Sequence, residues 1–134
     1  MLLLFYISFI CSCDKKPLER SGIVFTFDDR YVSEWYNARD LFSKYGIKAT
    51  FFIGRPQKLT PEEVLMLKQL KEDGHEIACH GMNHVNLNDF LLKNTIKDYF
   101  DQEVLPAIKK MRELGFKVKS YAYPYGVSTP AVNN

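Results

Sequence analysis

The stretch Phe25–Arg30, "FTFDDR", ends an apolar run with two adjacent aspartates. The run begins at Gly22 and reads "GIVFTF", a continuous series rich in β-branched and aromatic residues. Such a series is typical of a strand covered on both faces of a parallel sheet. Aspartate is common where strands end, so Asp28 and Asp29 fit an ordinary polar turn. Ligands of parallel sheets also bind at this end of the strands, and the rest of the chain decides between the two interpretations.

Extended and helical patterns alternate along the chain after this strand. The predicted elements are a helix at 32–45, a strand at 49–53, a helix at about 61–73 and a strand at 75–80. A loop or short helix from about 87, a helix at about 95–114 and a strand at 119–126 follow. In "TPEE", Thr60 is expected to cap the second helix, and Glu63 completes a capping box. Pro106 lies inside the third helical pattern and should kink or split it. The order predicts an α/β fold with about four parallel strands, three helices and right-handed crossovers.

Polar side chains of the kinds used in catalysis follow three of these strands. Asp28 and Asp29 follow the first strand, His80 and His84 follow the third, and Tyr125 follows the fourth. Parallel strands place their carboxyl ends at one edge of the sheet, where functional loops gather. We therefore expect these residues to lie close together, which unrelated turn residues would not need to do.

The segment "HGMNH" places two imidazoles, His80 and His84, four residues apart. No glutamate follows the first histidine, so the helical motif of zinc proteases is absent. Gly81 and Asn83 instead indicate a strand that leads into a tight turn. Two histidines and one carboxylate with open positions form a standard first-row metal site. Unrelated surface histidines remain the alternative for this spacing taken alone.

Four segments together resemble the polysaccharide deacetylases with a NodB homology domain, also called carbohydrate esterase family 4. "TFDD" at Thr26–Asp29 and "HGMNH" at His80–His84 resemble the first and second motifs of that family. "YPYG" at Tyr123–Gly126 resembles its third motif, and "GIKATFFI" at Gly46–Ile53 its second strand. The resemblance implies an incomplete (β/α) barrel of the NodB deacetylase type.

The resemblance also implies a role for each matching residue. Asp28 would be the general base, and Asp29, His80 and His84 would be the ligands of Zn²⁺ or another divalent first-row metal. A backbone N–H near Tyr125, which follows Pro124 in the third motif, would bind the oxyanion. The reaction implied is metal-dependent removal of N-acetyl groups from an N-acetylated polysaccharide, with a GlcNAc-containing polymer as the expected substrate.

The sequence departs from the family pattern at several positions. Arg30 stands where the first motif continues with glycine, and Ala122 stands where the third motif carries an arginine. The family's leucine-x-histidine motif supplies a catalytic acid, but the third histidine of this sequence, His75, begins the third strand at the opposite end of the sheet. We therefore interpret the chain as the N-terminal part of a deacetylase. The alternative is an inactive truncated remnant that binds metal or glycan without catalysis.

The first thirteen residues differ from the rest, because they are almost entirely apolar and carry no charged side chain. They fit the apolar part of a secretory signal, and "ICSC" resembles the lipobox of bacterial lipoproteins. Cys13 is the first choice for lipidation and membrane attachment, and Cys11 the second; a buried N-terminal strand is the alternative. We expect a leader at 1–13, a linker at 14–21 and the domain at 22–134. The expected location is exported, in the periplasm or at the cell surface.

Composition sets the remaining limits. The chain has 134 residues, of which 46% are hydrophobic, enough for one domain with a packed core. A net charge of +2 with both signs mixed along the chain gives no basic stripe, so we expect no nucleic-acid partner. Cys79 lies in an apolar segment and is expected to be a buried structural thiol.

Overall fold

The computed structural model describes residues 22–127. The predicted leader, its candidate lipidation residue Cys13 and the predicted linker at 14–21 lie outside the described residues. None of the helices in the described part of the chain is both long and apolar enough to cross a membrane.

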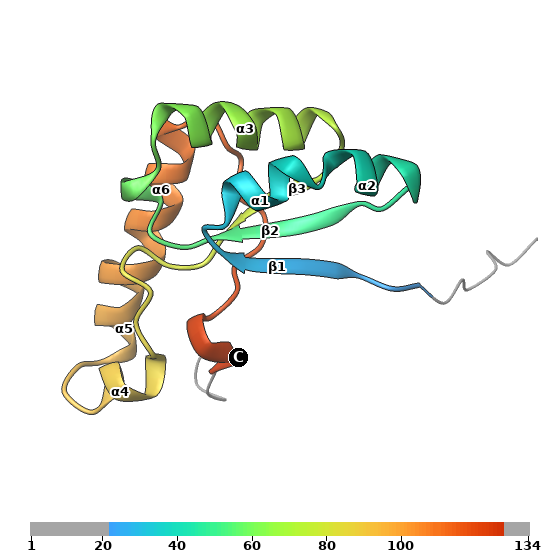
Figure 1. Cartoon of the computed structure of the whole chain (residues 1–134). Helices are drawn as coiled ribbons and strands as arrows, with labels where there is room; N and C mark the ends of the chain where they lie inside the picture. Colours follow the sequence, from blue (N-terminus) through green and yellow to red (C-terminus); the bar gives the residue numbers. More distant parts are fainter. Residues whose placement is uncertain (1–21, 128–134) are drawn as a thin grey trace, which may run out of the picture.

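A three-stranded parallel sheet forms the centre of the fold (Figure 1). Its strands are β1 (Phe25–Asp29), β2 (Ala49–Ile53) and β3 (Glu76–Cys79), in that spatial order. Asp29 pairs with Ile53, and Ile53 with Cys79, so the carboxyl ends of all three strands are in register. The first three predicted strands and their parallel direction are confirmed.

The fourth predicted strand, at 119–126, is reduced to one β-bridge between Tyr121 and Cys79. Cys79 N–H donates to Ser120 O (3.2 Å), and Ala122 N–H donates to Cys79 O (3.0 Å). The pairing stops there because Pro124 has no N–H to donate, and a 3₁₀ turn (Pro124–Gly126) follows at once. The segment still lies beside β3, where a fourth parallel strand was expected.

The helix predicted at 32–45 is two consecutive helices, α1 (Val32–Asn37) and α2 (Arg39–Lys44). The second helix is α3 (Pro61–Glu72), and its predicted capping box is present. Thr60 Oγ1 accepts from Glu63 N–H (3.1 Å), and Glu63 Oε2 accepts from Thr60 N–H (2.8 Å). A 3₁₀ turn (Pro56–Lys58) connects β2 to this helix.

The long segment after β3 was predicted to form a loop or short helix and then a helix from about residue 95, and the structure contains four elements there. They are α4 (Leu87–Leu91), α5 (Ile96–Tyr99), a π-helical turn (Phe100–Val104) and α6 (Leu105–Glu113). Pro106 lies in the first turn of α6, where its missing N–H costs little. The predicted split therefore takes the form of a widened turn just before Pro106, which accommodates a ring that would clash inside a regular helix.

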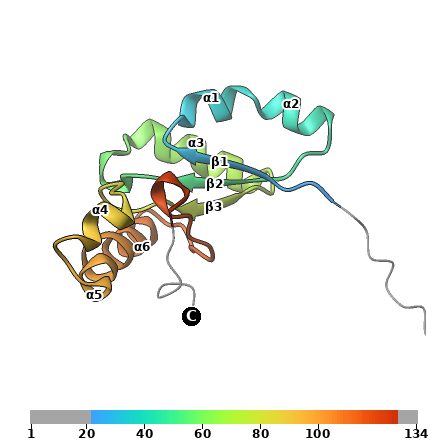
Figure 2. The same cartoon turned by 90° about the horizontal axis from the view of Figure 1, so that it is seen from below.

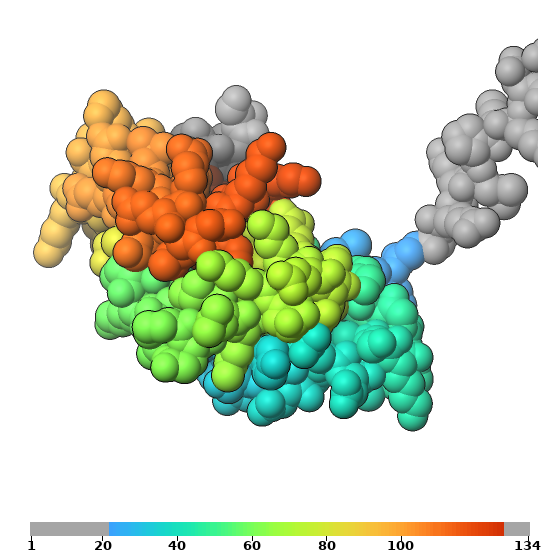
Figure 3. Space-filling view, turned by 90° about the horizontal axis from the view of Figure 1, so that it is seen from above, coloured from blue at the N-terminus to red at the C-terminus, as the bar shows by residue number. Residues whose placement is uncertain are grey.

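Helices α1, α2 and α3 cover one face of the sheet, and α4, α5 and α6 gather on the side toward which the strands' carboxyl ends point (Figures 1 and 2). The space-filling view shows α3 between the segment of α1 and α2 and the segment that includes α6 (Figure 3). These helices bury the β2 residues Ala49, Phe51 and Ile53. The expectation that the first strand is covered on both faces is wrong. β1 is an edge strand with an exposed face, on which Phe25 is 39% exposed, because no element covers that face in the described part of the chain.

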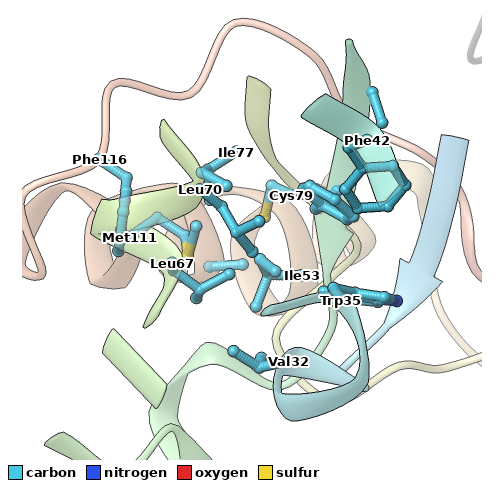
Figure 4. Close-up of a cluster of buried hydrophobic side chains, with 13 residues drawn as sticks. Val32, Trp35, Phe42, Ile53, Leu67, Leu70, Ile77, Cys79, Met111 and Phe116 are labelled. Carbon is cyan, nitrogen blue, oxygen red and sulfur yellow. The ribbon is translucent and has the colours of Figure 1, made fainter. Parts of the chain in front are cut away.

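The main core lies between the sheet and these helices (Figure 4). Phe51 is fully buried and stacks on Trp35, with ring centroids 4.9 Å apart. Phe27 and Phe42 also contact its ring. Burying aromatic rings of this size contributes a large hydrophobic stabilisation to such a small sheet.

Candidate metal centre

Asp29, His80 and His84 meet at the carboxyl edge of the sheet. Asp29 is the last residue of β1, His80 directly follows β3, and His84 ends the turn that begins there. Ligand atoms of the three side chains all lie within 4.8 Å of one another. The strand-end argument from the sequence therefore predicted a juxtaposition that the fold contains.

The backbone at this edge adopts conformations that side chains usually avoid. Asp29 has φ 79° and His84 has φ 62°, both in the left-handed region that L-residues enter at a cost. Non-glycine residues held in this way cluster at functional sites, because the surrounding structure must over-determine them. The chain bends sharply at both residues, and each bend turns a polar side chain toward the other.

The distances within the cluster suit one shared cation. His84 Nε2 lies 2.8 Å from Asp29 Oδ1, and His80 Nε2 lies 4.0 Å from the same oxygen. Donor atoms bound to one tetrahedral Zn²⁺ lie about 3.4 Å apart, given bond lengths of about 2.1 Å. The two measured separations bracket that value. Three protein ligands of this kind leave a fourth position open, as in catalytic zinc sites.

Two features around the histidines support the same interpretation. His80 is 2% exposed, and its Nδ1 lies 2.9 Å from Ala122 O, which fixes the proton on Nδ1 and leaves Nε2 free as a ligand. His84 Nδ1 is buried and has no hydrogen-bond partner among the described residues, and such an atom often marks a functional or ion site. The residues present therefore fit Zn²⁺ or another divalent first-row metal.

Gly54, directly after β2, provides the space in which the two rings lie. A Cβ atom at this position would lie 3.4 Å from His84 Cδ2 and 3.7 Å from His80 Cδ2. Any larger side chain would extend into the rings. The glycine thus belongs to the site, although no sequence pattern singled it out.

The other residues predicted at the site lie around this cluster. Asp28 precedes Asp29 in β1 and is exposed, so its carboxylate can exchange protons with solvent. Tyr125 has φ 64°, is 63% exposed, and places its ring edge-on to His84 with centroids 4.9 Å apart. Pro124 is buried beneath it. The Tyr125 N–H lies in the first turn of a 3₁₀ segment, so it has no partner within that turn.

His75 lies at the other end of the sheet, as the sequence predicted. It is 6% exposed, its Nδ1 accepts from Ala49 N–H (3.1 Å), and its ring packs against Phe42 and Phe51. Burial lowers the pKa of this imidazole, so it is held neutral as part of the core. Cys79 is also buried and is not in the metal cluster, in agreement with a structural thiol.

Arg30, one of the residues that depart from the family pattern, contacts the segment that leads into α3. Its Nη1 donates to Lys58 O and lies 4.0 Å from Glu63 Oε2. It therefore connects the end of β1 to the start of α3. Arg30 also lines a small cavity of about 100 Å³ that opens beside the cluster; the other lining residues are Asp29, Gly54, Arg55, Lys58 and His84.

Glu103 is a second residue at this edge, besides Gly54, that sequence reasoning missed. The segment around it was interpreted only as an apolar helical pattern, yet Glu103 is 1% exposed. Its carboxylate accepts from Asn83 N–H (2.9 Å), Asn83 Nδ2 (2.6 Å) and His84 N–H (3.2 Å). The one available signal was an acidic residue next to an apolar stripe, which is common in exposed helices and so carried no prediction.

The sequence is similar to proteins of one known family. A family profile described as "Polysaccharide deacetylase" matches residues 15–134. YxkH of Bacillus subtilis, whose name assigns it provisionally to the polysaccharide deacetylases, is 36% identical over 86 residues, which are 60% of this chain and 29% of that protein. The peptidoglycan-N-acetylglucosamine deacetylase of Bacillus cereus is 37% identical over 90 residues, which are 61% of this chain and 39% of that protein.

A solved structure supports the fold. The Streptococcus pyogenes deacetylase PplD, solved in complex with acetate, superimposes with a TM-score of 0.66 at 24% identity. The match covers 87% of this chain and 52% of that one. The chain thus spans about half the length of this structure and less of the two sequence relatives.

Proposed function

The chain belongs to the polysaccharide deacetylase family, and from that premise we propose that it carries the metal-binding and base residues of a metal-dependent hydrolase. The reaction is removal of N-acetyl groups from an N-acetylated polysaccharide. The observation that carries the proposal is the convergence of Asp29, His80 and His84 within 4.8 Å at the edge where parallel sheets bind ligands.

Asp29, His80 and His84 would hold the metal, Zn²⁺ or another divalent first-row ion, with a fourth position open to substrate or water. When bound, such an ion polarises a carbonyl oxygen and makes a bound water acidic near neutral pH. The hydrogen bond from His80 Nδ1 to Ala122 O keeps the ring oriented for this role.

Asp28 and Asp29 have different roles in the proposed reaction: Asp29 binds the metal and Asp28 is the general base. Asp29 faces the two imidazoles, whereas Asp28 is exposed and outside the cluster. Asp28 can therefore accept the proton of a water that attacks the acetamide carbon. The N–H of Tyr125 has no partner within its 3₁₀ turn, and its left-handed backbone fixes its direction; it is the donor we assign to the carbonyl oxygen as negative charge develops on it.

The proposed substrate is a GlcNAc-containing polymer. The Bacillus cereus relative named as a peptidoglycan-N-acetylglucosamine deacetylase supports this class. The exposed ring of Tyr125 beside His84 offers a flat face on which a pyranose can lie. A polymer of this kind outside the cytoplasm is consistent with the export and the Cys13 lipidation expected from the sequence.

Acyl labelling of a Cys13→Ala variant tests the lipid anchor. Loss of labelling supports the anchor, and unchanged labelling contradicts it.

Release of acetate from N-acetylchitooligosaccharide and from N-acetylated peptidoglycan by the full chain tests the proposed activity. We expect release that stops with a chelator, returns with Zn²⁺, and is lost in Asp28→Asn. Asp40→Asn, an exposed carboxylate on α2, is the matched control and should leave release unchanged. Zn²⁺ binding without acetate release would contradict the proposed activity and favour the alternative, a protein that binds metal or glycan without catalysis.

A further inference from the structure

We propose that Glu103 is a positioning residue that sets the backbone of the His80–His84 turn and thereby aims the His84 imidazole at Asp29. The inference rests on the proposed metal centre for its purpose, but the contacts that carry it belong to the protein alone. Glu103 lies twenty residues after the turn, on a different element, and touches neither Asp29 nor the imidazole nitrogens.

Glu103 binds three consecutive residues of the turn. Its carboxylate accepts from the N–H groups of Asn83 (2.9 Å) and His84 (3.2 Å) and from Asn83 Nδ2 (2.6 Å). Its backbone carbonyl accepts from Met82 N–H (3.1 Å). One buried residue therefore satisfies every backbone N–H between Gly81 and the second histidine.

The turn needs such a partner because its own conformation leaves these N–H groups without one. Gly81 has φ 91° and His84 has φ 62°, so the segment belongs to neither a strand nor a helix. A left-handed non-glycine residue costs of order 1–3 kcal/mol and persists only where its surroundings hold it. Consecutive N–H groups that converge on one anion form a concave site for negative charge, and the Glu103 carboxylate fills it.

The element that contains Glu103 places this residue next to the His80–His84 turn. Glu103 lies in the π-helical turn Phe100–Val104, and such turns occur frequently at functional sites. The preceding residue, Gln102, is exposed, whereas Glu103 and Val104 are both buried. Pro106 follows in the first turn of α6 and prevents a regular α-helical continuation across this point.

The Glu103 carboxylate has no cationic side-chain partner in the described part of the chain, where its three hydrogen bonds all come from Asn83 and His84. A buried carboxylate used only for stability is commonly paired with Arg or Lys, because an unpaired charge is costly to bury. Here the carboxylate instead accepts hydrogen bonds from the turn that presents a candidate ligand, His84. Partners of this kind, one step removed from the metal, change metal affinity about 10–100-fold when they are lost.

Three variants of the full chain test the inference, with two readouts. Glu103→Ala removes all the side-chain contacts. Glu103→Gln keeps one oxygen for the two backbone N–H groups, and its amide can pair with Asn83 after that side chain flips. Gln102→Ala, on the same turn but exposed, is the control. The readouts are amide hydrogen exchange at Asn83 and His84 in the metal-free protein, and Zn²⁺ affinity by competition with a chromophoric chelator.

We expect Glu103→Ala to lose protection at both amides and to bind Zn²⁺ at least about tenfold more weakly, with Glu103→Gln within about threefold of the wild type and Gln102→Ala unchanged. Unchanged protection and affinity in Glu103→Ala would overturn the inference, as would an equal loss in Gln102→Ala. Equal losses in Glu103→Gln and Glu103→Ala would also overturn it, because the inference predicts that Glu103→Gln keeps the geometry of the turn.

Two further outcomes remain decisive. If Glu103→Ala does not fold, Asn83→Ala, which deletes only the 2.6 Å contact, should keep the fold and weaken Zn²⁺ binding measurably; unchanged binding overturns the inference. If the wild type binds no Zn²⁺, the proposed metal centre fails, and hydrogen exchange alone decides whether Glu103 holds the turn.

Discussion

Replacing Gly81 by alanine should damage the candidate site more than the same change at a second left-handed glycine. Gly81 has φ 91°, and a Cβ there would lie 3.1 Å from both Glu103 Oε2 and Tyr121 Oη. Gly46 has φ 62°, and a Cβ there would meet no heavy atom within 4 Å. Both positions have a positive φ and they differ in what surrounds them, so Gly46 serves as the comparison for Gly81.

The magnitudes follow from these contacts. Alanine in the left-handed region costs about 1–2 kcal/mol at either position. At Gly81 the new methyl group also pushes on the oxygen that accepts from Asn83 N–H and His84 N–H. Loss of one hydrogen bond to a buried carboxylate costs about 1.5–3 kcal/mol. We therefore expect Gly81→Ala to lower the free energy of unfolding by about 3–5 kcal/mol and Gly46→Ala by about 1–2 kcal/mol.

Urea denaturation followed by tryptophan fluorescence measures the difference. With an m value of about 1.5 kcal/mol/M, Gly81→Ala should unfold at a midpoint lower by about 1–2 M than Gly46→Ala. Zn²⁺ affinity should fall in Gly81→Ala and not in Gly46→Ala, since only the first alters the turn that carries His84. Equal midpoints for the two variants would refute the reasoning, because the crowding around Gly81 would then have no energetic consequence.

Three further predictions concern residues away from the turn. Burial lowers the pKa of His75, so the unfolded chain binds a proton at a higher pH than the folded chain does. The free energy of unfolding should therefore fall as the pH drops below about 6.5, and it should fall less steeply in His75→Gln. Identical pH profiles for the two proteins would contradict this. Burial raises the pKa of Cys79 to about 11, so iodoacetamide should label it only after denaturation, as peptide mass spectrometry will report; labelling of the native protein would show that the thiol is accessible. Thr60→Ala should cost about 1 kcal/mol in urea by removing the cap of α3, and an unchanged midpoint would mean that the cap is not needed.

The sequence predicted the strand ends well because burial and parallel pairing leave little freedom there. "ATFFI" is an apolar run that the parallel sheet buries, and the pairing of β1 and β3 with it places Asp29 level with Ile53 and Cys79. The position of His80 follows directly from that register. The capping box at Thr60 was equally predictable, because it depends on residues three apart in the chain.

The features that were missed depend on contacts distant in the sequence. Glu103 meets Asn83 across twenty residues, and the helical period gives no sign of it because a π-helical turn changes which side chains point inward. The break of the first helix at Ala38 has no proline or glycine in the sequence to signal it. Arg30 shows the same limit, since its partner Lys58 O lies across the site on another element.

The thermal stability of the full chain with and without Zn²⁺ tests the metal centre most directly. At about 100 times the dissociation constant, a ligand that binds only the folded state stabilises it by about 2.7 kcal/mol, a rise of several degrees in Tm for a domain of this size. We predict this rise for the wild type and for His75→Gln, whose histidine lies at the other end of the sheet, and none for His80→Ala. No rise in the wild type, or an equal rise in His80→Ala, would contradict the assignment of Asp29, His80 and His84 as the metal ligands.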